Sequence, residues 1–105
     1  MAERYPWLGY VRYMVRKYPE WNKIRQSREL TRTESMGWSA VQIAVDCTER
    51  MENGSDRLKV IRIVHWNRTR TLEGAALMIP CSRRTAARWQ RNFFEEVARN
   101  RGLLD

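Results

Sequence analysis

The chain has 105 residues, a formal net charge of +8, 43% hydrophobic residues and five tryptophans. This length fits one domain, and the apolar content is sufficient for a core, which excludes a wholly disordered chain. The longest apolar run, residues 75–80, is far too short to span a bilayer, and no secretory segment is evident. We therefore expect a soluble, cytoplasmic protein with no membrane attachment.

The positive charge is concentrated in one half of the chain. Residues 57–105 hold eleven Arg and Lys side chains against four acidic ones, whereas residues 1–56 hold nine against eight. Scattered basic residues would indicate solubility alone, but this concentration favours a polyanionic partner such as double-stranded DNA. Arg outnumbers Lys in the basic half, which suits bidentate contacts with phosphate or guanine.

Two helices and a loop are predicted at the start of the chain. Pro6 is well placed as a first helical residue, and Pro19 should interrupt the helix that follows it. A second helix is predicted from Glu20 to about Leu30, and a connecting loop over 31–37, which lacks an apolar period. The first helix has apolar residues at three- and four-residue steps: Trp7, Tyr10, Val11, Met14 and Tyr18.

The next helix start is marked by two patterns at once. Ser39 and Gln42 have the spacing of a capping box. Trp38 and Ile43 occupy the two positions of a hydrophobic staple around that cap. The helix is therefore predicted to begin at about residue 39.

That helix should run to about Asn53 and be ended by Gly54 in a left-handed conformation. Ser55 or Asp56 then caps a segment over 57–67, whose β-branched residues would also suit a strand. We predict a helix, because the sequence offers no second strand with which it could pair. The expected fold class is all-α. It comprises an aromatic-rich helical packing or oligomerisation region at 1–54 and a DNA-binding region at 55–105, within one compact domain.

Residues 72–89 have the pattern of a helix–turn–helix: a short apolar helix, a tight turn and a longer helix. Thr69 or Thr71 starts the first helix, and Ser82 is a preferred cap for the second. The packing residues that such a unit needs are present: Ala75 and Ala76 at the crossing, Ile79 and Cys81 around the turn, and Ala86 after the cap.

The second helix of this unit should run from Arg83 to about Asn100, with Gly102 as its stop. Pro80 departs from the usual pattern, because many such turns place glycine there to allow a left-handed backbone. The proline ring should hold φ near about −65°, so we expect a turn that differs from the usual tight form.

The second helix has one cationic face. On a helical wheel at roughly 100° per residue, Arg84, Arg88 and Arg91 fall within about 60° of one another. A helix placed in the DNA major groove requires such a face opposite a buried one. An ordinary helical hairpin with solvated arginines is the alternative interpretation. The opposite side is apolar: Ala86, Trp89, Phe93 and Val97.

Each candidate DNA-binding residue has an expected role. Arg84 and Arg88 lie in the first two turns, where side chains reach base edges, and Arg91, one turn later, suits a phosphate. The remaining candidates surround these three. Arg83 and Thr85 should reach bases or the adjacent backbone, Ser82 belongs to the capped helix start, and Arg68, Arg70 and Thr71 should hold the phosphate of the facing strand.

A resemblance to a known family is carried by residues 56–94, DRLKVIRIVHWNRTRTLEGAALMIPCSRRTAARWQRNFF, and by RKYPEW at 16–21. These residues resemble the small late-transcription regulators of phages and prophages of the RinA/ArpU type. The helix–turn–helix of that family is similar to the promoter-reading region of sigma factors. The resemblance implies activation of phage late genes by promoter binding and by contact with host RNA polymerase.

The aromatic residues near the start of the chain allow three interpretations: core packing, an interface with a second copy or with polymerase, and attachment to a membrane surface. The near-neutral charge of this half argues against the membrane. A single recognition helix buries little surface, so we expect a homodimer through the N-terminal helices. Six of the eleven aromatic residues of the chain lie in the first 21 positions: Tyr5, Trp7, Tyr10, Tyr13, Tyr18 and Trp21.

No catalytic constellation is evident, so neither an enzyme nor a cofactor is expected. His65, Cys47 and Cys81 lack the spacing of a zinc site, and the two cysteines are expected to be small buried hydrophobes. Two other functions remain open: the small DNA-recognition subunit of a phage packaging terminase, and an adaptor that binds a protein partner and no DNA.

Overall fold

The computed structural model describes residues 5–104, and every regular element in that range is helical, which confirms the all-α prediction. Helix α5 contacts each of the other α-helices. The elements in chain order are α1 (Leu8–Ile24), α2 (Arg32–Glu49), α3 (Gly54–Ile61), the π-helical turn η1 (Arg62–Trp66), α4 (Leu72–Met78) and α5 (Arg83–Asn100).

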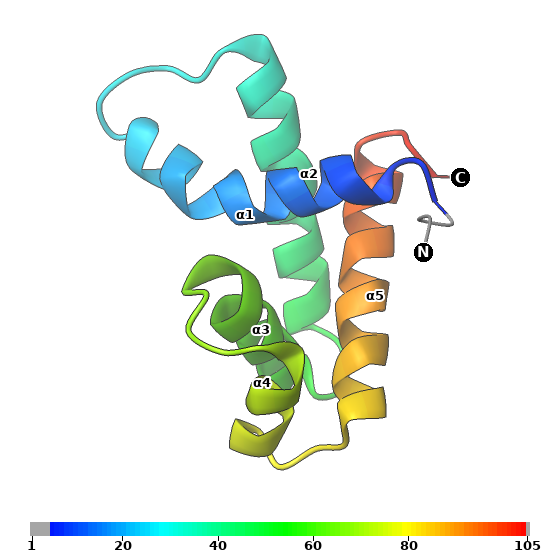
Figure 1. Cartoon of the computed structure of the whole chain (residues 1–105). Helices are drawn as coiled ribbons and strands as arrows, with labels where there is room; N and C mark the ends of the chain where they lie inside the picture. The colour runs from blue at the N-terminus through cyan, green and yellow to red at the C-terminus, as the bar shows by residue number, and fades with distance from the viewer. Residues whose placement is uncertain (1–4, 105) are drawn as a thin grey trace.

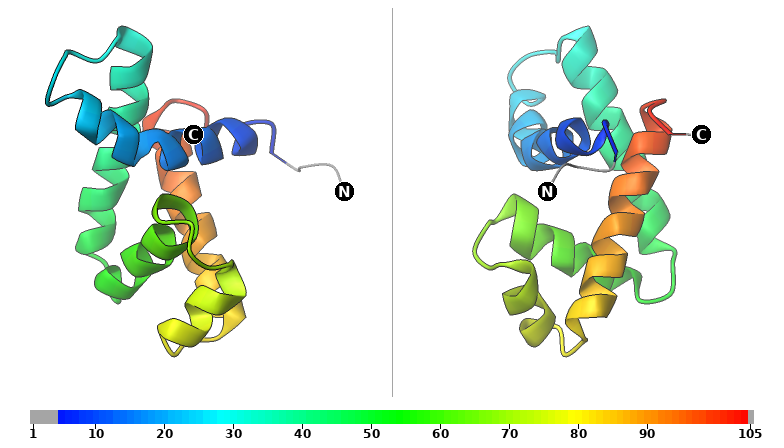
Figure 2. Two further views of the ribbon diagram at one scale, coloured as in Figure 1. Left: turned by 60° about the vertical axis from the view of Figure 1, so that its left-hand side comes forward. Right: turned by 45° about the vertical axis from the view of Figure 1, so that its right-hand side comes forward.

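The helices are arranged around α2 and α5, which lie side by side, while α1 crosses α2 near its middle and α5 near its C-terminal end (Figure 1). The segment from α3 to α4 packs at the other end, and two rotated views show α4 beside the start of α5 (Figure 2). The α4–α5 pair therefore lies at the end of the molecule away from the α1–α2 connection.

Two buried clusters hold this arrangement together. The larger joins both halves of the chain, so the region before residue 55 and the region after it share one core. The smaller lies at the α4–α5 end and includes Val60, Ile63 and Trp89. The larger cluster consists of Val11, Met14, Val15, Tyr18, Trp21, Ala40, Val41, Ala44, Leu58, Ile61, Phe93, Phe94, Val97 and Ala98.

Helix α1 passes through Pro19, so the predicted interruption at this residue is wrong. A proline inside a helix has no N–H, and the carbonyl four residues earlier loses its usual donor. Here the indole Nε1 of Trp66, in η1, donates to the carbonyl oxygen of Val15 at 2.9 Å. A side chain 51 residues away thus replaces the missing backbone donor.

The boundaries of α1 also differ from the prediction. The helix begins at Leu8, with Pro6 in the preceding turn, and it ends at Ile24. The predicted separate helix from Glu20 to Leu30 is therefore wrong, because Glu20 belongs to α1 and residues 25–30 are turn and loop.

Helix α2 begins seven residues before the predicted start, so the expected loop over 31–37 is wrong. Thr31 caps the helix: its side chain accepts from the Glu34 N–H at 3.2 Å, and the Glu34 carboxylate accepts from the Thr31 N–H at 2.9 Å. This is a capping box. The capping box and staple predicted around Ser39 are wrong, because these residues lie inside α2.

The buried face of α2 is made of small residues, which is why its helical period was missed. Gly37 packs against Trp21, and a Cβ at Gly37 would lie 2.8 Å from Cη2 of that ring. The side chains that mark a helix by hydrophobicity are therefore absent where the helices cross most closely. The buried positions are Gly37, Ala40, Val41, Ala44 and Thr48.

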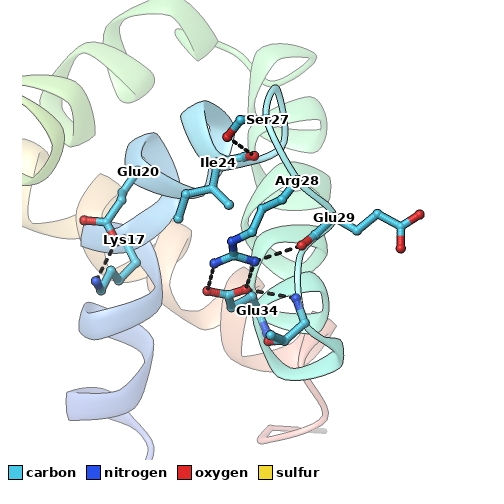
Figure 3. Close-up of polar contacts among 8 residues, drawn as sticks. Lys17, Glu20, Ile24, Ser27, Arg28, Glu29 and Glu34 are labelled. Carbon is cyan, nitrogen blue, oxygen red and sulfur yellow. Dashed lines mark hydrogen bonds and ion pairs between the residues drawn. The ribbon is translucent and has the colours of Figure 1, made fainter.

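The start of α2 is also held by an ion pair, which predicts that the stability of the protein depends on pH. The guanidinium of Arg28 faces Glu34 with nitrogen–oxygen distances of 3.1 and 3.2 Å (Figure 3). Hydrogen bonds from the Arg28 guanidinium and from the Thr31 N–H lower the pKa of Glu34 to about 2 from the usual 4.5. A carboxyl group with a lowered pKa adds stability above its unfolded pKa and loses it as the pH falls.

We expect Glu34→Gln to lower the urea midpoint of unfolding at pH 6. The midpoints of the variant and the wild type should converge as the pH falls from 4.5 to about 2. Glu29→Gln is the control, since the Glu29 side chain points away from this contact (Figure 3). Urea titrations of the three proteins at several pH values measure the difference. A Glu34→Gln deficit that stays constant down to the lowest pH would show that charge is not its cause.

The α2–α3 corner differs from the prediction in two ways. Helix α2 ends at Glu49, and the left-handed residue is Asn53, with φ of 59°. Gly54 is instead the first residue of α3, so neither Ser55 nor Asp56 is the cap. A Cβ at Gly54 would lie 2.4 Å from the carbonyl oxygen of Thr48, so glycine is needed here for close approach.

The segment predicted as a helix over 57–67 is helical, and a strand is not formed there. Its second part is the π-helical turn η1, in which the Asn67 N–H donates to the Arg62 carbonyl at 2.7 Å. This wider turn directs two successive side chains inward: His65 is buried, and Trp66 reaches α1.

Candidate nucleic-acid interface

The two helices of the predicted DNA-binding unit are α4 and α5, and side chains cap both of them. Thr71 accepts a hydrogen bond from the Gly74 N–H at 3.2 Å, which selects Thr71 over Thr69 as the start of α4. Ser82 accepts from the Thr85 N–H at 3.0 Å and begins α5. Helix α5 ends at Asn100, and Gly102 follows with φ of 82°, as the sequence predicts.

Small residues let α4 and α5 approach closely. Ala75, Ala76 and Ala86 are buried in the smaller cluster, and Ile79 is buried beside the turn. The free thiols of Cys47 and Cys81 are only half-buried, so the expectation that both are fully buried is wrong. Burial raises the pKa of the Cys81 thiol.

The turn between the helices has an unusual backbone at Pro80. Its φ is 24°, so the expected value near −65° is not found. The ring of proline disfavours positive φ, whereas glycine adopts it readily. The turn thus has a positive φ at the position where many helix–turn–helix units place glycine.

Helix α5 has the two faces that the helical wheel predicts. Arg84, Arg88 and Arg91 are exposed, and none of them has a carboxylate within ion-pair distance among residues 5–104. The opposite face is anchored in the two clusters, with Trp89 in one and Phe93 in the other. We call Arg84, Arg88 and Arg91 the α5 arginine stripe.

Two residues beside the stripe have partners within the protein. The Nε atom of Arg83 lies 3.1 Å from the Glu73 carboxylate of α4, with both side chains exposed. The Thr85 hydroxyl accepts from the Ser82 hydroxyl at 2.9 Å and is half-buried. These contacts fix the start of α5 to α4 and to its own cap.

Arg68 and Arg70 lie in the η1–α4 loop and are exposed. The side chain of Arg70 lies over Gly74, where an added Cβ would be 3.2 Å from the Arg70 Cβ. Arg68 has a left-handed backbone, with φ of 55°, and lines a hollow with Arg12 and Arg16 of α1. These two α1 arginines, which could have favoured attachment to a membrane surface, were not among the predicted DNA-binding residues, although their four-residue spacing places them on one helical face.

The N-terminal aromatic residues divide between core and surface. Tyr18 and Trp21 are buried, and the Tyr18 hydroxyl donates to Gln42. Tyr5 and Tyr13 are exposed, so core packing describes only part of the group. Apolar surface is also exposed at the end of α4, where Leu77 is 83% exposed and Met78 is 57% exposed.

No helix within residues 5–104 is long and apolar enough to cross a membrane. In the same range, His, Cys, Asp and Glu side chains form no group of three that could hold a metal ion. Comparison with protein-family models, curated proteins and solved structures finds no match for this chain.

Proposed function

We propose that this protein is a sequence-specific DNA-binding transcriptional regulator that places α5 in the major groove. The observation that carries the proposal is the α5 arginine stripe, which is exposed and has no carboxylate partner within residues 5–104, opposite a buried apolar face. Guanidinium groups in the first two turns of a capped helix match the way such helices contact base edges and phosphates. The proposed role is one of binding, without catalysis.

The stripe residues differ in their proposed tasks. Arg84 and Arg88 read bases, and Arg91 contacts a phosphate. Arg70 and Thr71, at the start of α4, contact the backbone of the facing strand. Arg83 reaches the backbone only after it leaves Glu73, so we assign it a smaller part in affinity.

The biological process in this proposal rests on the resemblance to phage late-transcription regulators of the RinA/ArpU type. The protein would then activate late promoters together with host RNA polymerase, as a homodimer. Exposed Tyr5 and Tyr13 on the N-terminal segment are compatible with such an interface, because tyrosine is enriched where proteins associate.

The test is selection of duplexes from a random library, followed by anisotropy titrations at several salt concentrations. A regulator should enrich one sequence, and the logarithm of its affinity should fall linearly with the logarithm of salt concentration. Sedimentation with and without the enriched duplex measures the oligomer, and a strict monomer that binds one site tightly would contradict the dimer.

Other outcomes would favour one of the two alternative functions. Assembly into a ring of many subunits, with duplex binding, would favour a packaging terminase subunit. Duplex affinity that is absent or insensitive to salt would favour the adaptor, for which the exposed Leu77 and Met78 offer a protein-binding surface.

A further inference from the structure

A second group of arginines lies outside the α4–α5 unit, in a hollow of about 450 Å³ between α1 and the η1–α4 loop. Arg12 and Arg16 enter it from α1 and Arg68 from the loop, with Tyr13 at its edge. The hollow also contains Glu20, which lies 2.7 Å from the Lys17 ammonium and is held by it. We call Arg12, Arg16 and Arg68 the α1–loop arginines.

Two of these three arginines, Arg16 and Arg68, lack a carboxylate partner within the described residues. Burial lowers the pKa of Arg16, and the charges of Arg68 and Arg12 lower it further. Arg16 and Arg68 are thus neighbouring like charges, and an anion bound between them would offset their repulsion.

The backbone at Arg68 adds an independent observation. Its φ of 55° lies in the left-handed region, where Gly or Asn is favoured and a long side chain is uncommon. Backbone strain of this kind persists at functional sites, because the side chain is needed in one position. Arg68 has this backbone conformation and supplies the loop cation of the hollow.

The hollow continues toward the α5 arginine stripe. A neighbouring cavity is lined by Arg12 together with Gln90 and Arg91 of α5. Arginines therefore follow one another from α5 across the start of α1 to the η1–α4 loop. A polyanion that lies along the α5 arginine stripe would therefore reach this hollow after Arg91.

We propose that the α1–loop arginines form a phosphate-binding site, which holds one backbone phosphate of the DNA that α5 contacts. This inference rests on the proposed function. Paired guanidinium groups suit phosphate oxygens because they donate several hydrogen bonds in a planar arrangement. The α1 helix thereby becomes part of the DNA interface, in addition to its role in the core.

The only histidine of the chain reports on this site. His65 Nδ1 accepts from Arg16 Nε at 3.5 Å, and His65 Nε2 lies 2.6 Å from the Gln90 amide oxygen, with the Phe94 ring beside it. Burial lowers the pKa of His65; Gln90 opposes this, and the α1–loop arginines lower the pKa further. A phosphate bound among the arginines would offset their charge and raise the pKa of His65.

The experiment follows the imidazole signals of His65 by NMR across a pH titration. We expect the pKa of His65 to rise by about half a pH unit or more on addition of the enriched duplex or of inorganic pyrophosphate, relative to sodium chloride at equal ionic strength. Arg68→Asn should abolish most of this rise, and asparagine suits the backbone at this position. Arg32→Gln is the control, because Arg32 is exposed and is the first residue of α2, outside the residues that line the hollow.

Duplex affinity gives a second readout. Arg16→Gln and Arg68→Asn should each reduce the slope of log affinity against log salt by about 0.9, the value for one phosphate contact, whereas Arg32→Gln should leave it unchanged. Unchanged slopes together with an unresponsive His65 would overturn the site while the proposed function stands. If wild type binds no duplex, the proposed function fails, and the response to pyrophosphate alone then decides for or against the phosphate site.

Discussion

Replacing Trp66 with phenylalanine is expected to lower the free energy of unfolding by about 1–3 kcal/mol, the cost of leaving a buried hydrogen-bonding group unpaired. Pro19 supplies no N–H to the Val15 carbonyl, and the Trp66 indole is the donor that the structure provides instead. Val15 is fully buried, which limits the access of water to this carbonyl. Phenylalanine keeps an aromatic ring beside Tyr18 but has no donor.

A double-mutant cycle with Pro19→Ala isolates the hydrogen bond from the loss of packing. Alanine at position 19 restores a backbone N–H that can donate to the Val15 carbonyl. The cost of Trp66→Phe should therefore be smaller by about 1 kcal/mol or more in the Pro19→Ala background. Urea unfolding of the four proteins gives the coupling energy. Equal costs of Trp66→Phe in both backgrounds would show that the indole does not compensate for the proline.

Arg88→Ala is expected to weaken binding to the selected duplex by about 1–3 kcal/mol, or roughly 5- to 150-fold, and to relax the sequence preference at one position. Arg88 lies in the middle of the exposed stripe and has no internal partner within residues 5–104, so its guanidinium is available to a base edge. Loss of a bidentate base contact weakens the specific complex more than the nonspecific one.

Arg70→Ala is the matched comparison, because Arg70 is proposed to contact the backbone. It should weaken binding to the selected duplex and to a random duplex by similar factors, and it should reduce the salt slope. Anisotropy titrations with both duplexes measure the two variants side by side, with Arg32→Ala as the control for loss of charge. Equal losses on both duplexes for Arg88→Ala would remove its proposed reading role.

The C-terminal half of the fold was predictable because its signals are local. Thr71 and Ser82 are strong caps, Gly102 marks a stop, and the apolar face of α5 contains large side chains at helical spacing. Each of these features acts within one or two helical turns. The exposure of the α5 arginine stripe followed from the same periodicity.

The N-terminal half was predicted less well, for two physical reasons. Helix α2 buries glycine and alanine, so its period is carried by small residues, and its capping box at Thr31 and Glu34 lies within a segment that lacks an apolar period. Helix α1 continues through Pro19, and a distant indole pairs with the buried Val15 carbonyl that the proline leaves without a backbone donor. Neither the small-residue crossing nor the distant donor has a local signature.

The candidate site shows the same division. The stripe on α5 was found from helical spacing alone, whereas the hollow formed by Arg12, Arg16 and Arg68 depends on how α1 packs against η1. The Arg83–Glu73 ion pair likewise depends on the geometry of the α4–α5 turn. Contacts between elements distant in sequence require the tertiary structure.

Because α5 bears the arginine stripe and also packs against α1 and α2, the two roles cannot be separated by truncation. A fragment of residues 55–104 would retain every stripe arginine but would uncover Phe94, Val97 and Ala98, and such a surface favours aggregation over a free-standing module. Grafting this helix pair onto another scaffold would therefore transfer the guanidinium groups without the packing against α1 and α2 that fixes the orientation of α5.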